Sequence, residues 1–169
     1  MNWFLDSGLI NEDDTVDDGI DIETCEPTGT VFTYNSGVIL GALTELHKLT
    51  SNDTFIDTAH RIAHGAMEHL VDDNGILTEH GAGAIDDLDP TAAMFKGAFV
   101  RNLKYLHKAD PKPEYVTFLQ KNADVMWRED RIDRGRIGAN WQGKNHDATS
   151  SSQGAGFDVL VSAAAVTER

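Results

Sequence analysis

Apolar residues recur at helical spacing in four long segments of the chain. In residues 32–49 they cover more than one stripe, which is typical of a helix that neighbours contact on several sides. In residues 53–70 they form a single stripe, and charged residues lie outside it. The pattern therefore predicts an inner helix followed by an amphipathic outer helix, with Asp53 as the N-cap of the outer one.

The same order of segments repeats sixty positions later. Residues 37–48, GVILGALTELHK, align without a gap with residues 97–108, GAFVRNLKYLHK. The repeat predicts a second inner helix over 92–108 and a second outer helix over 113–128. A third copy is expected to begin near Gln153, slightly out of this register.

Long connections rich in glycine and aspartate, residues 72–90 and 135–150, separate these units. Loops of that length are usually functional or disordered. Inner helix, short turn, outer helix and long return loop is the order of an α/α toroid, whose long loops collect around the mouth of a central cavity. A closed ring of this kind commonly has six helix pairs, and the chain has at most about three. We therefore expect an all-α fold that is a partial (α/α)6 toroid.

Charge and composition narrow the class of partner. The 169 residues include 28 acidic and 14 basic side chains, for a formal net charge of -14. Such a chain repels nucleic acid and anionic lipid, whereas a neutral sugar is indifferent to net charge. No run approaches the roughly 18 apolar residues of a membrane helix, and the first residues lack the features of a secretion signal, so we expect neither signal nor anchor. Cys25 is the single cysteine, which excludes an internal disulfide.

Five sequence segments carry a resemblance. They are TYNSGVILGAL at 33–43, NGILTE at 74–79, FKGAFVRNL at 95–103, NAD at 122–124 with Trp127, and SSSQGAGFDVL at 150–160, accompanied by Trp3, Asp18-Gly19 and Tyr105. Their order and spacing resemble the family 76 glycoside hydrolases, which include fungal cell-wall enzymes and bacterial endo-1,6-α-mannanases. The resemblance covers nearly the whole chain as a single domain, 1–169. It implies the C-terminal half of a toroid that cleaves or transfers α-1,6-linked mannan with retention of configuration.

The resemblance also implies that the catalytic residues lie outside this chain. In the family, two adjacent aspartates upstream of the TYNxG segment serve as nucleophile and acid/base. Retaining hydrolysis needs two carboxyl groups about 5 to 5.5 Å apart, so we assign no catalytic residue and expect the chain alone to be inactive. The acidic doublets of the chain are no substitute, because adjacent side chains point to different sides and such loops favour turn-forming aspartates. These doublets are Asp13-Asp14, Asp17-Asp18, Asp72-Asp73 and Asp86-Asp87.

Six residues are candidates for sugar binding, because they begin inner helices or lie in a loop at the mouth. They are Tyr34, Asn35, Phe95, Lys96, Trp141 and Gln153. Structural alternatives remain open: Tyr34 and Asn35 could satisfy a helix start, Lys96 could be simply exposed, and Trp141 could pack under its loop. Ser36 stands where the family most often has glutamine.

The sequence indicates no metal or cofactor. His60 and His64 lie one turn apart on an outer helix with no third ligand, so we interpret them as a surface pair. No glycine-rich nucleotide-binding loop occurs.

Two functions stay open. The first is a family 76 enzyme whose catalytic half is missing from this chain, and the second is a non-catalytic helical-repeat protein with a sugar-binding or scaffolding surface. In both cases the expected partner is α-1,6-mannan or another mannose-containing glycan, and self-association through the open face of the ring is expected. The family is typically secreted or at the cell surface, but the chain itself gives no localisation.

Overall fold

The computed structural model describes residues 2–79, 91–143 and 148–167, and within these ranges the fold is helical. Its longer helices are α2 (Thr33–Thr50), α3 (Asp53–His69), α4 (Phe95–Ala109), α5 (Pro113–Val125) and α6 (Ser150–Thr167). Shorter elements are α1 (Asn2–Asp6), the 3-10 turns η2 (Ala92–Met94) and η4 (Asp133–Gly135), and the π-helical turn η3 (Met126–Asp130). The predicted all-α class is confirmed. None of the described helices has the length and hydropathy to cross a membrane.

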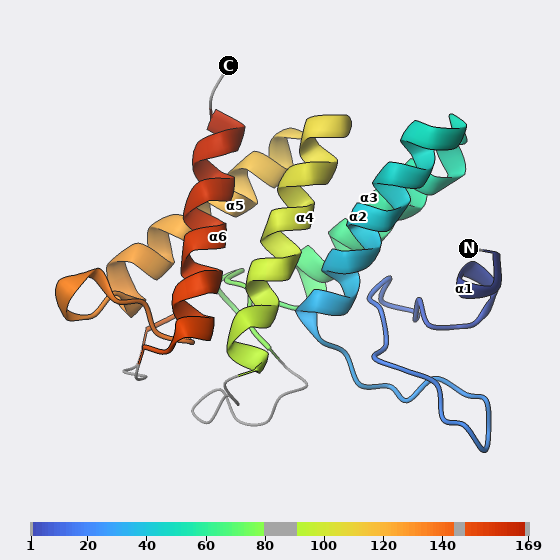
Figure 1. Ribbon diagram of the computed structural model, residues 1–169, viewed down its shortest axis with the longest axis horizontal. Helices are drawn as coiled ribbons and strands as arrows, with labels where there is room; N and C mark the ends of the chain where they lie inside the picture. Colours follow the sequence, from blue (N-terminus) through green and yellow to red (C-terminus); the bar gives the residue numbers. More distant parts are fainter. Residues whose placement is uncertain (1, 80–90, 144–147, 168–169) are drawn as a thin grey trace.

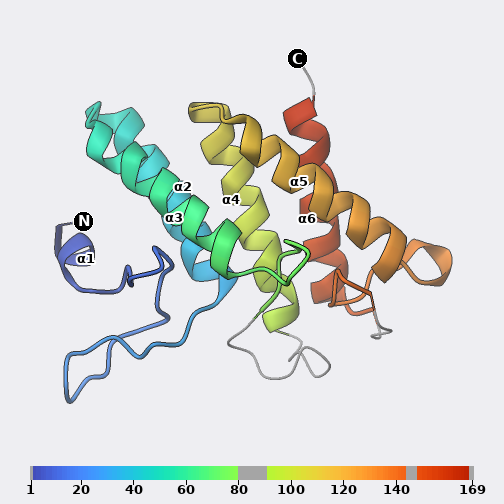
Figure 2. The same cartoon turned by 180° about the vertical axis from the view of Figure 1, so that it is seen from behind.

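The helices form two layers. Figure 1 shows α2, α4 and α6 side by side in front, and Figure 2, seen from the opposite side, shows α3 and α5 in front of them. Helix α3 packs against α2, while α5 packs against both α4 and α6. The predicted division into inner and outer helices is therefore confirmed.

The sixty-residue repeat is also a repeat in space. Helices α3 and α5 begin at Asp53 and Pro113, sixty positions apart. Three isolated antiparallel bridges close equivalent loops: Ile10 with Val16, Val71 with Leu77, and Arg131 with Ile137. Each loop follows a helix, so the short α1 stands where an outer helix would end. The described chain thus holds an outer-helix end, two full helix pairs and a third inner helix.

Glycines let the inner helices lie close together. A Cβ at Gly37 would lie 2.6 Å from the Cα of Phe99, and a Cβ at Gly97 would lie 2.9 Å from the Cα of Ala155. Any side chain at either glycine would therefore push two helices apart. This explains why both copies of the repeat begin at a glycine.

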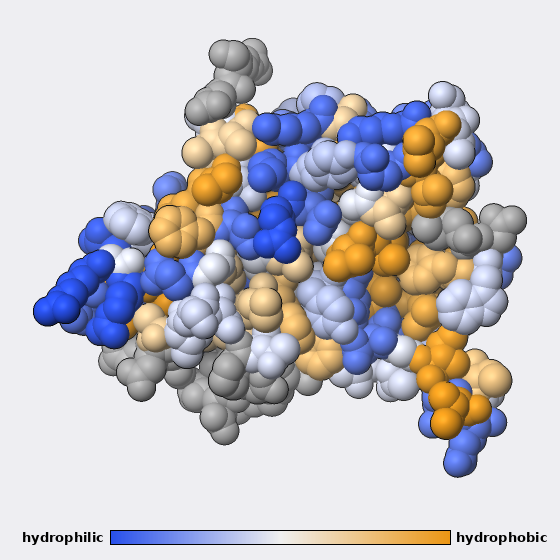
Figure 3. Space-filling view, viewed as in Figure 1, coloured by the Kyte–Doolittle hydropathy of each residue, from blue (hydrophilic) through white to orange (hydrophobic). Residues whose placement is uncertain are grey.

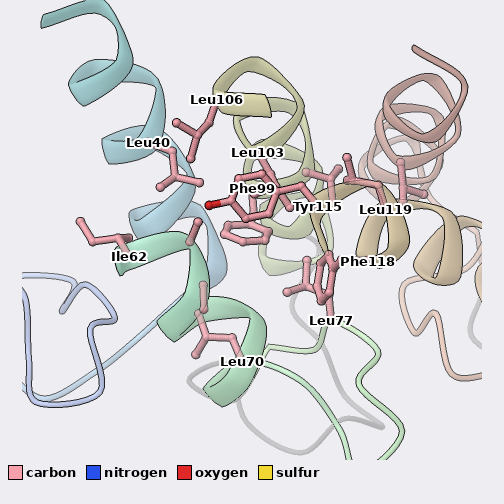
Figure 4. Close-up of a cluster of buried hydrophobic side chains, with 14 of the residues drawn as sticks. Leu40, Ile62, Leu70, Leu77, Phe99, Leu103, Leu106, Tyr115, Phe118 and Leu119 are labelled. Carbon is pink, nitrogen blue, oxygen red and sulfur yellow. The ribbon is translucent and has the colours of Figure 1, made fainter. Parts of the chain in front are cut away.

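The core fills the space between the two layers. Figure 4 shows side chains from α2, α3, α4 and α5 that point toward one another. Fully buried members include Leu40, Ile62, Phe99, Leu103, Leu106, Tyr115 and Leu119. Burial of this apolar surface is what holds the outer helices to the inner ones.

Two helix boundaries differ from those predicted for the first and second units. Asn52, not Asp53, is the N-cap of α3, because its Oδ1 accepts a hydrogen bond from Thr54 N at 3.1 Å. The second outer helix ends in a π-helical turn that continues to Asp130.

The third inner helix also begins earlier than expected. Helix α6 starts at Ser150, three residues before Gln153. Thr149 Oγ1 accepts from Ser152 N at 3.1 Å, and Ser152 Oγ accepts from Thr149 N at 2.9 Å. This reciprocal cap satisfies backbone donors at the helix start, as a capping box does.

Candidate glycan-binding site

Aromatic rings cluster at the end of the molecule where the inner helices begin. The ring centroids of Tyr34 and Phe95 lie 4.4 Å apart, and that of Phe32 lies 5.4 Å from Phe95. Tyr34 is in the first turn of α2 and Phe95 is the first residue of α4, so the close packing of these two helices brings the rings together. All three side chains are only partly buried, and ring surface remains available to a ligand.

An exposed carboxylate completes this aromatic cluster. Asp18 Oδ1 accepts hydrogen bonds from the Tyr34 hydroxyl and from Asn35 Nδ2, the latter at 3.1 Å. The hydrogen bond to Asp18 raises the pKa of Tyr34 to about 12, so the hydroxyl stays protonated. Sequence reasoning missed Asp18 as a site residue, although its Asp-Gly segment was part of the family resemblance.

The neighbouring Asp17 points elsewhere. It is buried, and its carboxylate accepts from Asn11 Nδ2 at 2.9 Å and from Gly29 N at 3.1 Å. Asp17 therefore fixes the loop from which Asp18 projects. The prediction that adjacent acids face different sides is confirmed at this doublet.

A cavity of about 350 Å³ opens beside the aromatic cluster, between the first halves of α2, α4 and α6. Its lining includes Tyr34, Phe95, Arg101, Ser150, Ser151 and Asp158. Aromatic surface, hydroxyl groups and a charged pair thus face one space. This mixture suits a neutral ligand with both C–H faces and hydroxyl groups.

Lys96 and Trp141 lie beneath the mouth instead of on its surface. Lys96 is 1% exposed, and its Nζ donates to Ala139 O at 2.6 Å. The ammonium lies 5.1 Å from the ring centroid of Trp141, which is 0% exposed. In this structure neither side chain offers a sugar a polar atom or a ring face. Trp141 packs under its loop, which was the structural alternative to sugar binding. Lys96 neither reaches the cavity nor is exposed, so neither of its two alternatives describes it.

Lys96 belongs to a buried charged layer, which we define as Glu79, Lys96 and Asp130. Glu79 is 1% exposed; its Oε2 accepts from Thr33 N at 3.0 Å and its Oε1 accepts from the Thr33 hydroxyl, so it caps α2. Burial raises the pKa of Glu79 and of Asp130 to about 7 each, and lowers the pKa of Lys96 to about 8. The carboxylates favour the charged form of Lys96, so the layer joins the return loops to the helix starts electrostatically.

Comparison with known proteins identifies the family. The sequence profile of glycosyl hydrolase family 76 matches residues 1–168. The chain belongs to this family. No curated protein sequence matches.

Several solved structures share the fold. The chain is similar to the Lin0763 protein from Listeria innocua, with 26% identity, a TM-score of 0.80, and coverage of 99% of this chain and 48% of that one. It is similar to the α-1,6-mannanase GH76A from Salegentibacter sp. HEL1_6, with 25% identity, a TM-score of 0.76, and coverage of 95% and 46%. Dfg5 from Chaetomium thermophilum, solved with glucosamine, has 20% identity, a TM-score of 0.82, and coverage of 98% and 43%, and shows the fold alone. The chain spans about half the length of each of these proteins.

The remaining predicted site residue of this family 76 chain also lies beneath the mouth. Gln153 Oε1 accepts from Ile137 N at 3.0 Å, which ties α6 to the return loop after α5. Tyr34, Asn35 and Phe95 thus gather at the mouth, while the other three predicted residues support it. Ser36 is fully buried and does not reach the cavity.

The prediction that His60 and His64 form a surface pair is correct for His64 only. His60 has a side chain that is 13% exposed; its Nδ1 is 2.6 Å from the Tyr115 hydroxyl and its Nε2 is 2.8 Å from Asp110 Oδ2. It therefore joins α3 to the start of α5, while His64 is 53% exposed. Within the described ranges, no three His, Cys, Asp or Glu side chains are grouped in a way that could hold a metal ion.

Proposed function

We propose that this chain forms part of the glycan-binding cleft of a family 76 enzyme that acts on α-1,6-linked mannan, in the manner of cell-wall mannan processing. In this proposal residues 1–169 correspond to the C-terminal half of the toroid. The carrying observation is the cavity beside Tyr34 and Phe95, where aromatic rings and hydroxyl groups from three helices face one space. The family and the similarity to an α-1,6-mannanase support the choice of glycan.

The catalytic step is proposed to depend on residues outside this chain. An inactive variant of the Salegentibacter mannanase, in which two adjacent aspartates are replaced by alanine, was solved with α-1,6-mannotetrose. Hydrolysis with retention needs two carboxyl groups across the scissile bond. The exposed Asp18 stands next to the buried Asp17, whose oxygens are bound within its own loop, so this doublet does not supply such a pair. We infer that the chain contributes binding and not bond cleavage.

Glycan binding is tested by calorimetric titration of the full chain with α-1,6-mannotetraose. Tyr34→Ala and Phe95→Ala should each weaken binding about tenfold, because each removes an aromatic wall of the cavity. Trp3→Ala is the matched control, since Trp3 is a 69% exposed aromatic residue of α1 outside the cavity. No binding by the wild-type chain, or equal losses in all three variants, would refute the proposal.

A second property, self-association, is supported by the free face of the inner helices. Figure 3 shows apolar side chains over α2 and α6 on this face, with hydrophilic ones over α4 between them. Large apolar residues of the inner helices and of η2 that are at least half exposed are Val38, Leu49, Met94, Phe157 and Val161. Exposed apolar patches of this kind favour association. We propose that a second copy of the chain covers this face when the chain is isolated, a scaffolding behaviour compatible with glycan binding.

A further inference from the structure

The lining of the cavity includes an ion pair that the sequence did not single out. Arg101 of α4 donates from Nη1 to Asp158 Oδ2 of α6 at 2.5 Å. Both residues line the cavity beside Tyr34 and Phe95. The Asp158 side chain is 26% exposed and that of Arg101 is 54% exposed, so the pair is reachable from the cavity.

The fold makes room for this carboxylate with a glycine. A Cβ at Gly97 would lie 2.7 Å from Asp158 Oδ2. Burial raises the pKa of Asp158, and the neighbouring Arg101 offsets that rise by stabilising the charged form. The carboxylate is therefore held in a partly desolvated position against α4, where its hydrogen bonds are stronger than in water.

The repeat shows that helix packing does not require this pair. The position sixty residues before Arg101 is Gly41, where a Cβ would clash with Asn102 Oδ1 of α4. Among the described residues no ion pair joins α2 to α4, although these two backbones approach as closely as those of α4 and α6. A pair that occurs at one of two equivalent junctions needs an explanation other than the fold.

The chemistry of the pair fits a neutral polyhydroxyl ligand. A guanidinium has five N–H donors and a carboxylate has two acceptor oxygens. Among the described residues, Arg101 and Asp158 make no side-chain hydrogen bond other than the one from Nη1 to Oδ2 that joins them. The other donors of the guanidinium and acceptors of the carboxylate therefore remain for a ligand. Because the two charges are opposite, the pair offers a sugar charge-assisted hydrogen bonds of both directions.

We propose that Arg101 and Asp158 anchor the hydroxyl groups of one neutral pyranose residue, whose C–H face lies against Tyr34 and Phe95. This inference rests on the proposed glycan binding and adds two residues that determine its strength. Asp158 accepts from sugar hydroxyls and Arg101 donates to sugar oxygens, while their mutual hydrogen bond keeps both groups in position before the ligand arrives.

Two conservative substitutions test the pair in the full chain. Asp158→Asn keeps the shape and removes the charge, and Arg101→Lys keeps the charge and removes the planar fork. Each should raise the Kd for α-1,6-mannotetraose about tenfold or more, as expected for loss of a charge-assisted hydrogen bond. Glu45→Gln and Lys48→Arg are matched controls, because Glu45 and Lys48 form an ion pair at 3.1 Å on α2, outside the cavity. These controls should change Kd less than twofold.

The outcomes separate the two proposals. If the wild-type chain binds mannotetraose and both cavity variants bind within twofold of it, the pair is only a link between α4 and α6 and the inference fails while glycan binding stands. If the wild-type chain does not bind, both fail. If a variant does not fold, NMR of the wild-type chain tests the proposal instead. Binding of mannotetraose should shift the Arg101 Nε–H resonance. If that resonance does not move in the bound state, Arg101 does not anchor the sugar.

Discussion

The buried carboxylate of Glu79 should make the stability of the chain depend on pH in a direction opposite to that of most acidic side chains. Burial raises its pKa from 4.5 to about 7. A group whose pKa is raised in the folded state contributes stability that is fully present below the unfolded pKa and is lost as the pH rises through the folded pKa. The contribution of Glu79 to the free energy of unfolding should therefore fall between about pH 4.5 and pH 7.5.

The magnitude follows from the difference between the two pKa values. A shift of about 2.5 units corresponds to about 3 kcal/mol. Glu79→Gln removes this titration, while the amide oxygen can still accept from Thr33 N. The stability difference between the variant and the wild type should therefore shift by roughly 2–3 kcal/mol in favour of the variant from pH 4.5 to pH 7.5. Asp130, whose pKa is raised in the same direction, contributes to both proteins and largely cancels in the comparison.

Urea denaturation followed by circular dichroism at several pH values measures this difference. Glu68→Gln is the control, since Glu68 is an exposed carboxylate of α3, and its stability curve should run parallel to that of the wild type. If the Glu79→Gln curve were also parallel to the wild type, Glu79 would titrate alike in the folded and unfolded chain. The argument that burial controls its charge would then be wrong.

Three further predictions follow from the packing and the proposed function. Gly97→Ala should lower the free energy of unfolding by about 1–3 kcal/mol, because the added methyl group overpacks against α6. Gly154→Ala should raise it by about 0.5–1 kcal/mol, because nothing lies within 4 Å of the added Cβ. Thermal melts in which both substitutions change stability in the same direction would contradict this. Sedimentation velocity should show oligomers that Phe157→Lys reduces, and a monodisperse wild-type monomer would rule out the proposed association. Chromatography of α-1,6-mannan incubated with the chain should show no released oligomers, and any detected hydrolysis would overturn the inferred lack of activity.

The fold could be predicted because the repeat and the apolar spacing report the same packing. Gly37 and Gly97 are sixty positions apart, and each marks the close approach of two inner helices. The start of α6 was placed too late because its signal is local: Thr149 and Ser152 cap each other within four residues. Such a cap lies outside the apolar pattern, so comparison of repeat units does not reveal it.

Half of the candidate site depended on contacts that the sequence does not encode locally. Tyr34 and Phe95 could be placed at the mouth because both begin inner helices. Trp141 and Gln153 are held by partners on other segments, namely the Lys96 ammonium and the Ile137 backbone. A loop has no periodicity, so nothing in the residues around Trp141 indicates which side of the loop is buried.

Lys96 and Arg101 show how the inner helices divide support from binding. Five residues on a helix correspond to a rotation of about 140° beyond a full turn, so these two cations of α4 cannot face the same way. Lys96 shares its stripe with Phe99, Val100 and Leu103, all 0% exposed.

Arg101 instead follows Met94 and Ala98 at spacings of seven and three, and all three line the cavity. The residues of an inner helix that contact sugar should therefore lie on the same stripe as the cavity-lining residues of its first turn. Charged residues on the opposite stripe, such as Lys96, hold the return loops in place. This rule uses helical spacing alone, and it separates ligand-facing from supporting side chains on α4 once one cavity residue is known.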